Sequence, residues 1–434
     1  MPHARARTIR AVAVLAVVAA MGLVACGKSK KSTSASTGKT VYIGFVGAKT
    51  GDNANLGINI RDGIKVAIDE ENAKKDGPTI ALKEFDTAGD PAQATTVAPQ
   101  FIQDTSIIGT VGPAFSGETK ALIPLYQDAK LVFISPSATN VKLPTIVSPE
   151  TVFHRVIADD ALQASGIASY LSQTVKPKSV AFINDNSEYG KGLAVDVQRL
   201  SVDKGIKAAT TQVIDPKAQD FSATVNAVKA SGADTVFYGG YYAAAGLLRK
   251  QLVDAGVKGT FVSGDGSLDK GFVTAAGPAA AEGAKLTCPC NLAFSSSTGA
   301  LKTFYDQFKK DIGKDPGLYS PEAYDAAKIL IKGIKAGNTT RAALLDYVNN
   351  KVGSYAGISK TIKFESNGNI GSTQFFVFEV KGAEIAPSQT IVADKPAETT
   401  TTAGSGGSSG SSTTVTGSSG STTTTVASTT TSKP

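Results

Sequence analysis

The chain reads VYIGFVGAKTG at residues 41–51, an apolar run followed by a loop rich in glycine. Residues 41–46 are apolar apart from one glycine, as expected for a strand that is buried on both faces. Beyond the loop, apolar residues such as Ile60 and Ile64 recur at helical spacing, which predicts a helix over residues 58–75. A buried strand, a tight loop and a helix form the repeating half-unit of a parallel sheet covered by helices.

The same alternation continues along the chain in two series. In the first series, strands are predicted at 79–85, 107–111 and 131–134, and helices begin at Asp90-Pro91 and at Ser116. In the second series, helices at 161–175, 187–204, 221–230 and 243–255 alternate with strands at 179–183, 206–213, 235–238 and 260–262. Three helices follow, at 298–311, 319–335 and 340–349, and then a last strand at 375–380. The predicted fold class is α/β, with two doubly wound lobes built on parallel sheets.

The N-terminus has the features of an export signal. Arg5, Arg7 and Arg10 precede an apolar run over residues 11–25, which is shorter than the roughly 20 residues that span a bilayer. The sequence LVAC at 23–26 resembles the bacterial lipobox, whose cysteine is diacylated and becomes the first mature residue. We therefore predict a signal peptide at residues 1–25 and a lipidated Cys26, with a short membrane anchor helix as the alternative.

Two segments of low complexity flank the remaining chain. Residues 26–39 are mostly Lys, Ser, Thr and Gly, and we interpret them as a flexible tether. Residues 393–434 are mostly Ser, Thr, Gly and Ala, and such a composition cannot bury enough surface to fold. The tail is therefore predicted to be disordered, as a glycosylated or wall-spanning spacer or as a plain solvated segment.

The composition between these ends favours binding over catalysis. About 350 residues suit two lobes of ordinary domain size. Without the three signal-peptide arginines the charge falls from +7 to +4, and no basic stripe of the nucleic-acid type is present. His154, in a strand-like run at 153–156, is the one histidine beyond the signal peptide. The sequence therefore predicts no metal site, no cofactor, no nucleic-acid partner and no enzyme activity.

Two cysteines, Cys288 and Cys290, lie beyond the signal peptide and the lipobox, separated by one proline. That spacing is too short for an ordinary zinc site. Export implies an oxidising compartment, in which a tight local disulfide can form. A disulfide and two free buried thiols are both compatible with the sequence.

Several segments together resemble the leucine/isoleucine/valine-binding branch of the type I periplasmic binding proteins. Most of them fall at the end of a predicted strand or at the start of a helix, where doubly wound sheets bind ligands. They are GFVGAKTG (44–51), ISPSATN (134–140), NSEYGKG (186–192), YGGYY (238–242) and YDAA (324–327). The resemblance covers residues 41–392.

The resemblance implies two lobes joined by three hinge crossings, which close around a small molecule. Lobe I would comprise residues 40–156 and 291–364, and lobe II would comprise 157–290 and 365–392. It further implies an ATP-driven importer with a membrane permease as partner. Together with the lipobox at 23–26, the expected location is the outer face of the cell membrane, with a lipid anchor at Cys26. The expected ligand is a branched-chain or similar small amino acid.

The resemblance also implies the site residues. Ser116 and the loop of Ser137, Ala138 and Thr139 match the family's carboxylate-binding residues, whereas Ser116 and Thr139 could also simply cap helices. Tyr189, Tyr241 and Asp265 match the closing contacts of the second lobe. Tyr319 would line the side-chain subsite. Plain alternatives are a solvated turn for Asp265 and core packing for Tyr319.

Three departures from the family pattern leave the ligand open. Asp265 replaces the usual Glu, Leu56 stands where branched-chain binders often carry an aromatic residue, and Gly89 and Phe115 occupy the positions of a disulfide found in some relatives. The alternatives are the same fold binding a short amide, urea or an aromatic acid, and a ligand sensor for a membrane receptor. An acid at position 265 favours a ligand with an amine, because an unpaired buried carboxylate is costly.

Overall fold

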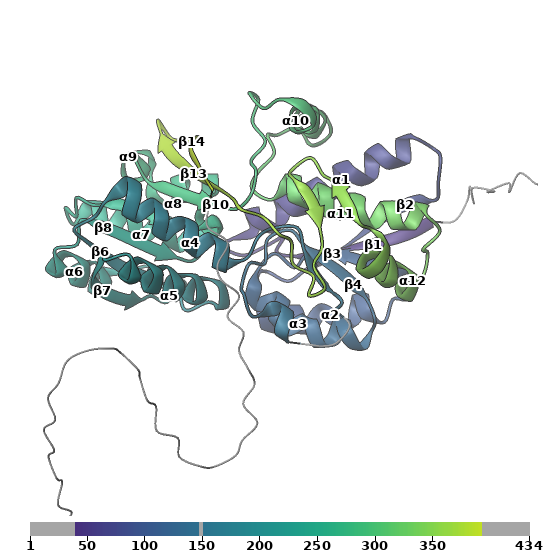
Figure 1. The fold of residues 1–434 in the computed structure, drawn as a ribbon, viewed down its shortest axis with the longest axis horizontal. Coiled ribbons are helices and arrows are strands. Elements are labelled where there is room, and N and C mark those ends of the chain that lie inside the picture. Colours follow the sequence, from purple (N-terminus) through teal and green to yellow (C-terminus); the bar gives the residue numbers. More distant parts are fainter. Residues whose placement is uncertain (1–39, 147–150, 393–434) are drawn as a thin grey trace, which may run out of the picture. The chain divides into compact units, whose positions relative to one another are not determined.

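The computed structural model describes residues 40–146 and 151–392, all within one compact unit, Met1–Lys395. The predicted signal peptide, Cys26, the tether and the tail lie outside the described residues. Figure 1 shows two groups of strands, each with its own covering helices. No helix in residues 40–146 or 151–392 is long and apolar enough to cross a membrane.

The first sheet has five parallel strands in the order β2-β1-β3-β4-β5. The strands are β1 (Thr40–Gly47), β2 (Thr79–Asp86), β3 (Ile107–Val111), β4 (Val132–Ser135) and β5 (Phe153–Arg155). Every residue of β3 and β4 is buried, because helices cover both faces of the sheet. The predicted strand at 107–111 is confirmed in full, and the others differ at their ends by a residue or two.

The helices of this group come from two distant parts of the chain. Those that follow strands are α1 (Ala54–Ala73), α2 (Pro91–Ile102) and α3 (Ser116–Asp128). Those that return after the second sheet are α10 (Gly299–Ile312), α11 (Ser320–Lys335) and α12 (Arg341–Asp346), with a small hairpin of β11 (Ser354–Ala356) and β12 (Thr361–Lys363). Helix α11 packs along α1, and the Arg341 guanidinium donates to four carbonyls around β3, among them that of Ile107.

The second sheet has seven strands in the order β14-β13-β10-β9-β8-β6-β7. Five are parallel, namely β6 (Ser179–Asn184), β7 (Lys207–Val213), β8 (Thr235–Gly239), β9 (Thr260–Ser263) and β10 (Lys285–Cys288). The covering helices are α4 (Asp160–Tyr170), α5 (Glu188–Asp203), α6 (Ser222–Ser231), α7 (Tyr242–Asp254), α8 (Lys270–Ala276) and α9 (Pro278–Ala281). The chain passes between the two groups three times, after β5, after β10 and before β13, which agrees with the three crossings expected from the resemblance. The residue limits of the two lobes stay predictions.

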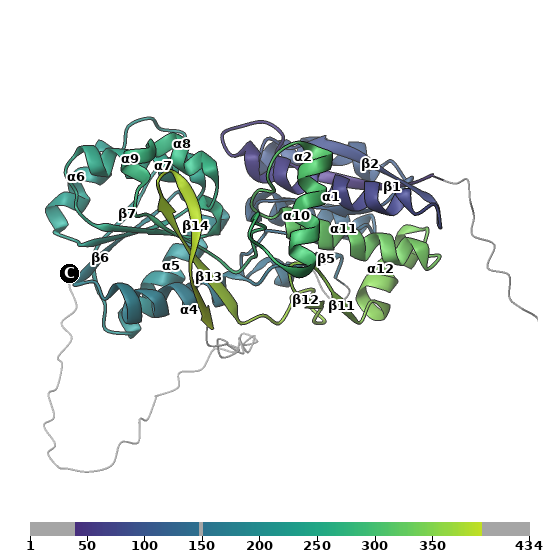
Figure 2. The same ribbon diagram turned by 90° about the horizontal axis from the view of Figure 1, so that it is seen from above.

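One edge of the second sheet departs from the parallel arrangement. Strands β13 (Gln374–Lys381) and β14 (Glu384–Val392) form an antiparallel hairpin, shown in yellow in Figure 2, and β13 is also antiparallel to β10. The two-residue turn, Gly382-Ala383, has positive φ angles of 56° and 70°, the turn geometry that a tight hairpin favours. Strand β14 lies beyond the last strand predicted from the sequence, because it is polar and contains Pro387.

His154 has a structural role, as its place in β5 suggested. It is 1% exposed, and its ring lies 4.8 Å from that of Phe364. Burial lowers the pKa of His154 to about 4, against hydrogen bonds with Asn349 and Val152. The imidazole is therefore neutral at ordinary pH and contributes to packing.

Candidate ligand-binding site

A small cavity lies where the strand ends of the two sheets face each other. Its lining comes from loops after β3 and β4, from α1, from loops after β8 and β9, from the start of α5 and from the residue before α11. The lining residues are Leu56, Ala114, Phe115, Ser116, Ser137, Tyr189, Tyr241, Asp265, Gly266 and Tyr319. The structure thus brings together six of the eight residues predicted from sequence.

The first face of the cavity presents hydrogen-bond donors at the start of α3. Ser116 is the first residue of that helix and is 1% exposed. Its hydroxyl accepts from the Asn140 backbone N–H at 3.2 Å and donates to no described residue. The hydroxyl proton and the positive end of the helix dipole are therefore available to an anion. Ser137 lines the same face, but its hydroxyl donates to the Ala114 carbonyl at 2.8 Å.

Ala138 and Thr139 lie behind this face and do not line the cavity. The Ala138 N–H donates to the Ser135 hydroxyl at 2.9 Å, and the Ala138 carbonyl accepts from Arg155 at 3.1 Å. The Thr139 carbonyl accepts from the Asp160 N–H at 2.9 Å. Both residues therefore shape the loop that follows β4.

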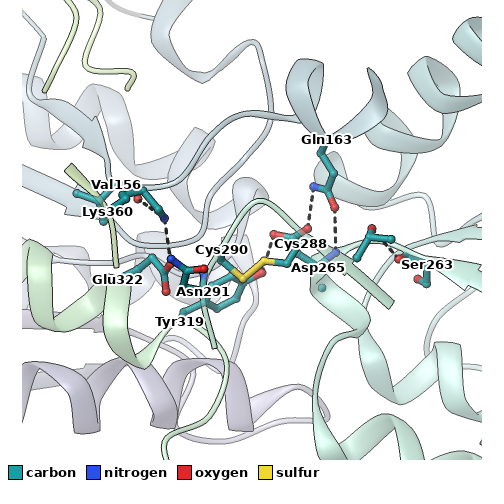
Figure 3. Close-up of a disulfide and its surroundings, with 12 residues drawn as sticks. Val156, Gln163, Ser263, Asp265, Cys288, Cys290, Asn291, Tyr319, Glu322 and Lys360 are labelled. Carbon is teal, nitrogen blue, oxygen red and sulfur yellow. Dashed lines mark hydrogen bonds and ion pairs between the residues drawn. A yellow bond between two sulfur atoms is a disulfide. The ribbon is translucent and has the colours of Figure 1, made fainter. Parts of the chain in front are cut away.

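The second face presents a carboxylate, Asp265, which is 1% exposed. Its Oδ1 accepts from the Tyr189 hydroxyl at 2.6 Å and from Gln163 Nε2 at 2.9 Å, and its Oδ2 accepts from the Tyr319 hydroxyl at 2.8 Å. Figure 3 shows Gln163 and Tyr319 reaching Asp265 from different sides. The alternative of a solvated turn residue is therefore wrong.

Local glycines allow this close packing around Asp265. A Cβ atom at Gly266 would lie 2.8 Å from Cε1 of Tyr189 and 2.9 Å from the Gly240 carbonyl oxygen. Such distances are shorter than real Cβ contacts, so the position requires glycine. The Gly-Asp-Gly sequence thus lets Tyr189 approach the carboxylate directly.

Tyr319 belongs to the first group of elements, and its side chain reaches the second group. It precedes α11, which packs on α1, and its backbone has a φ angle of 66°, in the left-handed region that tyrosine seldom adopts. The hydroxyl bond from Tyr319 to Asp265 therefore joins the two groups at the cavity. Non-glycine residues in this region often mark functional sites, because surrounding contacts must hold them there.

Aromatic rings form the walls of the cavity. The ring of Tyr241 lies 4.6 Å from Phe115, edge to face, and 5.2 Å from Tyr189. A Cβ atom at Gly89 would lie 2.8 Å from the Phe115 ring, so the two positions that carry a disulfide in some relatives are also adjacent here. Leu56, 1% exposed, adds an aliphatic wall.

Two further polar residues, Asp160 and Gln163, were missed by the sequence analysis. Both lie in the first turn of α4 and are almost wholly buried. Gln163 Nε2 donates to Asp160 Oδ1 at 3.0 Å as well as to Asp265, and Gln163 Oε1 accepts from the Asp265 N–H at 3.0 Å. The sequence feature that could have indicated Asp160 is the pair Asp159-Asp160 at a predicted helix start. Acidic residues at such a position are typical of an ordinary N-cap.

The second face is strongly acidic for a buried site. Burial raises the pKa of Asp265, although hydrogen bonds from Tyr189, Tyr319 and Gln163 oppose the rise. Burial and the nearby Asp265 raise the pKa of Asp160 well above its usual range. The Thr139 hydroxyl lies near enough to favour the charged form of Asp160, but makes no hydrogen bond of normal geometry with it. A cation bound here would stabilise both carboxylates.

The passage that leaves β10 contains the two cysteines. Cys288 and Cys290 are joined as a disulfide, with Cα atoms 5.1 Å apart, and both are fully buried. The next residue, Asn291, donates its backbone N–H to Glu322 Oε1 at 3.0 Å. The redox state of the pair in the cell stays a prediction.

Glu322 connects this passage with the one that leaves β5. Its carboxylate is 0% exposed and pairs with Lys360 Nζ at 2.9 Å, and Lys360 also donates to the Val156 carbonyl at 3.2 Å (Figure 3).

Across residues 40–146 and 151–392, no group of three or more His, Cys, Asp or Glu side chains could hold a metal ion.

Comparison with known proteins gives a consistent result. The leucine-, isoleucine-, valine-, threonine- and alanine-binding protein of Pseudomonas aeruginosa is 30% identical over 345 residues, which cover 78% of this chain and 90% of the relative. Two solved structures share the fold. The branched-chain amino acid transporter substrate-binding protein LivJ from Streptococcus pneumoniae, in complex with isoleucine, has a TM-score of 0.75 at 24% identity, covering 81% of this chain and 99% of that one. A solute-binding protein from R. palustris, in complex with benzoate, has a TM-score of 0.73 at 17% identity, covering 83% and 98%.

A family model described as periplasmic binding protein matches residues 40–384, which is nearly the whole described range. The fold class predicted from sequence, two α/β lobes of the type I periplasmic binding proteins, is therefore confirmed. This chain belongs to the periplasmic binding protein family.

Proposed function

We propose that this protein captures a branched-chain or similar small apolar amino acid and delivers it to an ATP-driven importer in the membrane. The observation that carries the proposal is the pairing of opposite chemistries across one cavity, with Ser116 at a helix start on one side and Asp265 on the other. A free amino acid carries both complementary charges, a carboxylate and an ammonium group. Relatives and neighbours of this chain are named as amino-acid-binding proteins and not as enzymes, which supports binding as the function.

Closure of the two lobes is part of the proposal. The α-carboxylate would meet Ser116 and the dipole of α3, whereas the ammonium would meet Asp265 beside Tyr189 and Tyr241. A ligand that contacts both sides only when they are together stabilises the closed form. The side chain would then lie against Leu56 and the aromatic walls.

The acidic second face argues against a ligand without a cation. Benzoate is bound by the R. palustris neighbour, but at 17% identity that likeness supports the fold alone. In this chain a second anion beside the buried Asp265 and Asp160 would have no positive partner on that face. An amine-bearing ligand is favoured for the same reason.

Calorimetry with four probes tests the proposal. L-leucine should bind more tightly than 4-methylpentanoate, which lacks the ammonium group, and than 3-methylbutylamine, which lacks the carboxylate. Benzoate should bind weakly or not at all. Equal affinity for leucine and 4-methylpentanoate would contradict the assignment of an ammonium seat, and a thermal-shift screen of the amino acids would reveal a different preferred side chain.

Export and membrane anchoring are proposed from the N-terminal sequence. Periplasmic binding proteins act outside the cytoplasm, and LVAC at residues 23–26 follows an apolar run. Burying acyl chains contributes about 0.8 kcal/mol per CH₂ group, so a multiply acylated Cys26 would hold the protein on the outer face of the cell membrane. Cys26→Ser should therefore move the protein from the membrane fraction to the medium, and retention of the variant in membranes would refute the anchor.

The transport role is testable separately from binding. Deleting the gene for this protein from its host should abolish uptake of the labelled amino acid at low concentration. Intact uptake together with a lost response to that amino acid would instead favour the second candidate, a ligand sensor for a membrane receptor. The lobes would look the same in either case.

A further inference from the structure

The feature that the proposed binding mode leaves unused is the second buried carboxylate, Asp160. Asp160 and Asp265 both accept from the same nitrogen, Gln163 Nε2, at 3.0 and 2.9 Å. Their acceptor oxygens can therefore be no more than about 6 Å apart, a range in which like charges strongly disfavour each other. The other oxygen of Asp160, Oδ2, is buried and has no hydrogen-bond partner among the described residues.

The positive charge that acts on Asp160, the guanidinium of Arg155, is hydrogen-bonded to other groups. Arg155 is fully buried and donates to the carbonyls of Ala138 and Asn140, to Asn369 and to Asp159. It favours the charged form of Asp160 from a distance but makes no hydrogen bond with it. The pair therefore holds two carboxyl groups in one buried place without a direct cationic partner.

The remaining groups that face the pair do not supply a positive charge. The hydroxyls of Tyr189 and Tyr319 act on Asp265, and the carboxylate of Asp159 acts on Asp160. The phenol of Tyr241 lines the cavity beside them. Burial raises the pKa of each of the three tyrosines well above its usual range, so the phenols stay neutral. A proton or a bound cation must therefore offset the second negative charge.

We propose that Asp160 and Asp265 share one proton while no cation lies at the second face, and that capture of an ammonium group releases this proton to solvent. The inference rests on the proposed function, because it needs a ligand with an ammonium group. In the free site the proton sits on an oxygen of the pair. In the complex the ammonium carries the positive charge, both carboxyl groups are ionised, and the proton leaves to the buffer.

The direction of the pH dependence follows from this exchange. The pKa values of the pair are raised in the free site and fall when the cation binds. Binding therefore releases protons at pH values that lie between the pKa of the complex and the pKa of the free site. Affinity for the amino acid should therefore weaken as the pH falls below the pKa of the free pair, by about tenfold per pH unit when one whole proton is released. A binding site with one permanently charged carboxylate would show no such slope.

Calorimetry of the purified full-length chain in buffers of different ionisation enthalpy measures the released protons directly. L-leucine is the probe, or the amino acid with the largest thermal shift if leucine does not bind. Proton release approaching one per ligand is expected at pH values just below the raised pKa of the free pair, and 4-methylpentanoate should release none. Leucine binding without proton exchange at any pH at which the protein stays folded would overturn the inference while leaving the proposed function intact.

Two matched variants assign the proton. Asp160→Asn keeps the size of the side chain and an acceptor for Gln163, and it should abolish both the proton release and the pH slope. Glu118→Gln is the control, because Glu118 is another fully buried carboxyl group, whose pKa burial raises to about 7, and it is a competing source of a proton. It shares no donor with Asp265, so its variant should release protons as the wild type does.

The variants also separate the possible failures. Loss of proton release in Glu118→Gln with retention in Asp160→Asn would assign the proton to Glu118 and overturn the inference. Should Asp160→Asn fail to fold, proton release with leucine that persists in Glu118→Gln and is absent with 4-methylpentanoate still decides the matter. If no amino acid binds at all, the proposed function fails first, and the inference fails with it.

Discussion

The loops after β3 and β4 and the loops after β8 and β9 face the same cavity, but they present opposite chemistry. The first set offers a hydroxyl and the start of a helix, both of which favour an anion. The second offers Asp265, with Asp160 behind it, and favours a cation. A zwitterion bound between them would hold the two sets together, whereas an ion of either sign would satisfy only one of them.

The two faces also differ in how their polar groups are held. On the first face, Ser116 receives one backbone bond and keeps its proton free. On the second, Asp265 receives three side-chain donors, two from its own group of elements and one from Tyr319 across the cavity. The cation seat is therefore already assembled by the protein, and its orientation does not depend on one contact alone.

The largest loss of affinity for L-leucine is expected for Asp265→Asn, because this variant removes the charge of the second face. Breaking one half of a buried charged pair costs roughly 2–5 kcal/mol, so affinity for L-leucine should fall by at least about tenfold. Affinity for 4-methylpentanoate should stay the same or rise. Titration calorimetry with both probes measures this, and an unchanged affinity for leucine would show that Asp265 meets no ammonium.

A suitable control for that variant is Asp185→Asn. Asp185 is 2% exposed, accepts from the Ser187 N–H and hydroxyl, and does not line the cavity. Burial raises its pKa, as it does for Asp265. The control should bind leucine nearly as the wild type does, which would exclude a general effect of removing a buried charge.

A smaller loss is expected for Ser116→Ala, on the first face. The variant removes the free hydroxyl donor but keeps the helix dipole and the backbone N–H groups of α3, so we expect a loss of about three- to tenfold. Because the α-carboxylate is common to both probes, leucine and 4-methylpentanoate should weaken together. A loss confined to leucine would place the carboxylate elsewhere.

Much of this comparison could be predicted from the sequence, because parallel sheets place their binding loops at strand ends. Ser116 follows a strand of five buried residues, and Asp265 follows β9 in the same way. Periodicity therefore located both faces. It failed at β14, where a polar edge strand with an internal proline lacks the apolar alternation that predicts a strand.

The rest of the site depends on contacts between segments far apart in the chain. Asp160 and Asp265 are more than a hundred residues apart, and they share a donor only because η3 (Asp265–Ser267) lies against the start of α4. In the sequence, Asp160 follows another aspartate at a helix start and is indistinguishable from a cap. Likewise, nothing local indicates that Tyr319 takes a left-handed backbone and bonds across the cavity.

The smallest loss is expected at the rim, where the two groups touch without reaching the cavity. Asn55, near the start of α1, donates its amide to Asp269 Oδ1 at 2.8 Å, and Asp269 caps α8 on the other side. A hydrogen bond of this kind contributes about 0.5–1.5 kcal/mol. If it exists only in the closed form, Asn55→Ala should weaken leucine binding by about two- to tenfold, with the change in the dissociation rate.

Asn350→Ala is the matched control for the rim, because Asn350 is also an exposed asparagine that donates to an aspartate, Asp346, at 2.8 Å. Both residues of that bond lie in one helical segment of the first group, so closure neither makes nor breaks it. Stopped-flow dissociation of leucine should be faster in Asn55→Ala and unchanged in Asn350→Ala. Equal rates in both variants would mean that the rim bond persists when the ligand leaves, and that the energy of closure comes from the two faces of the cavity alone.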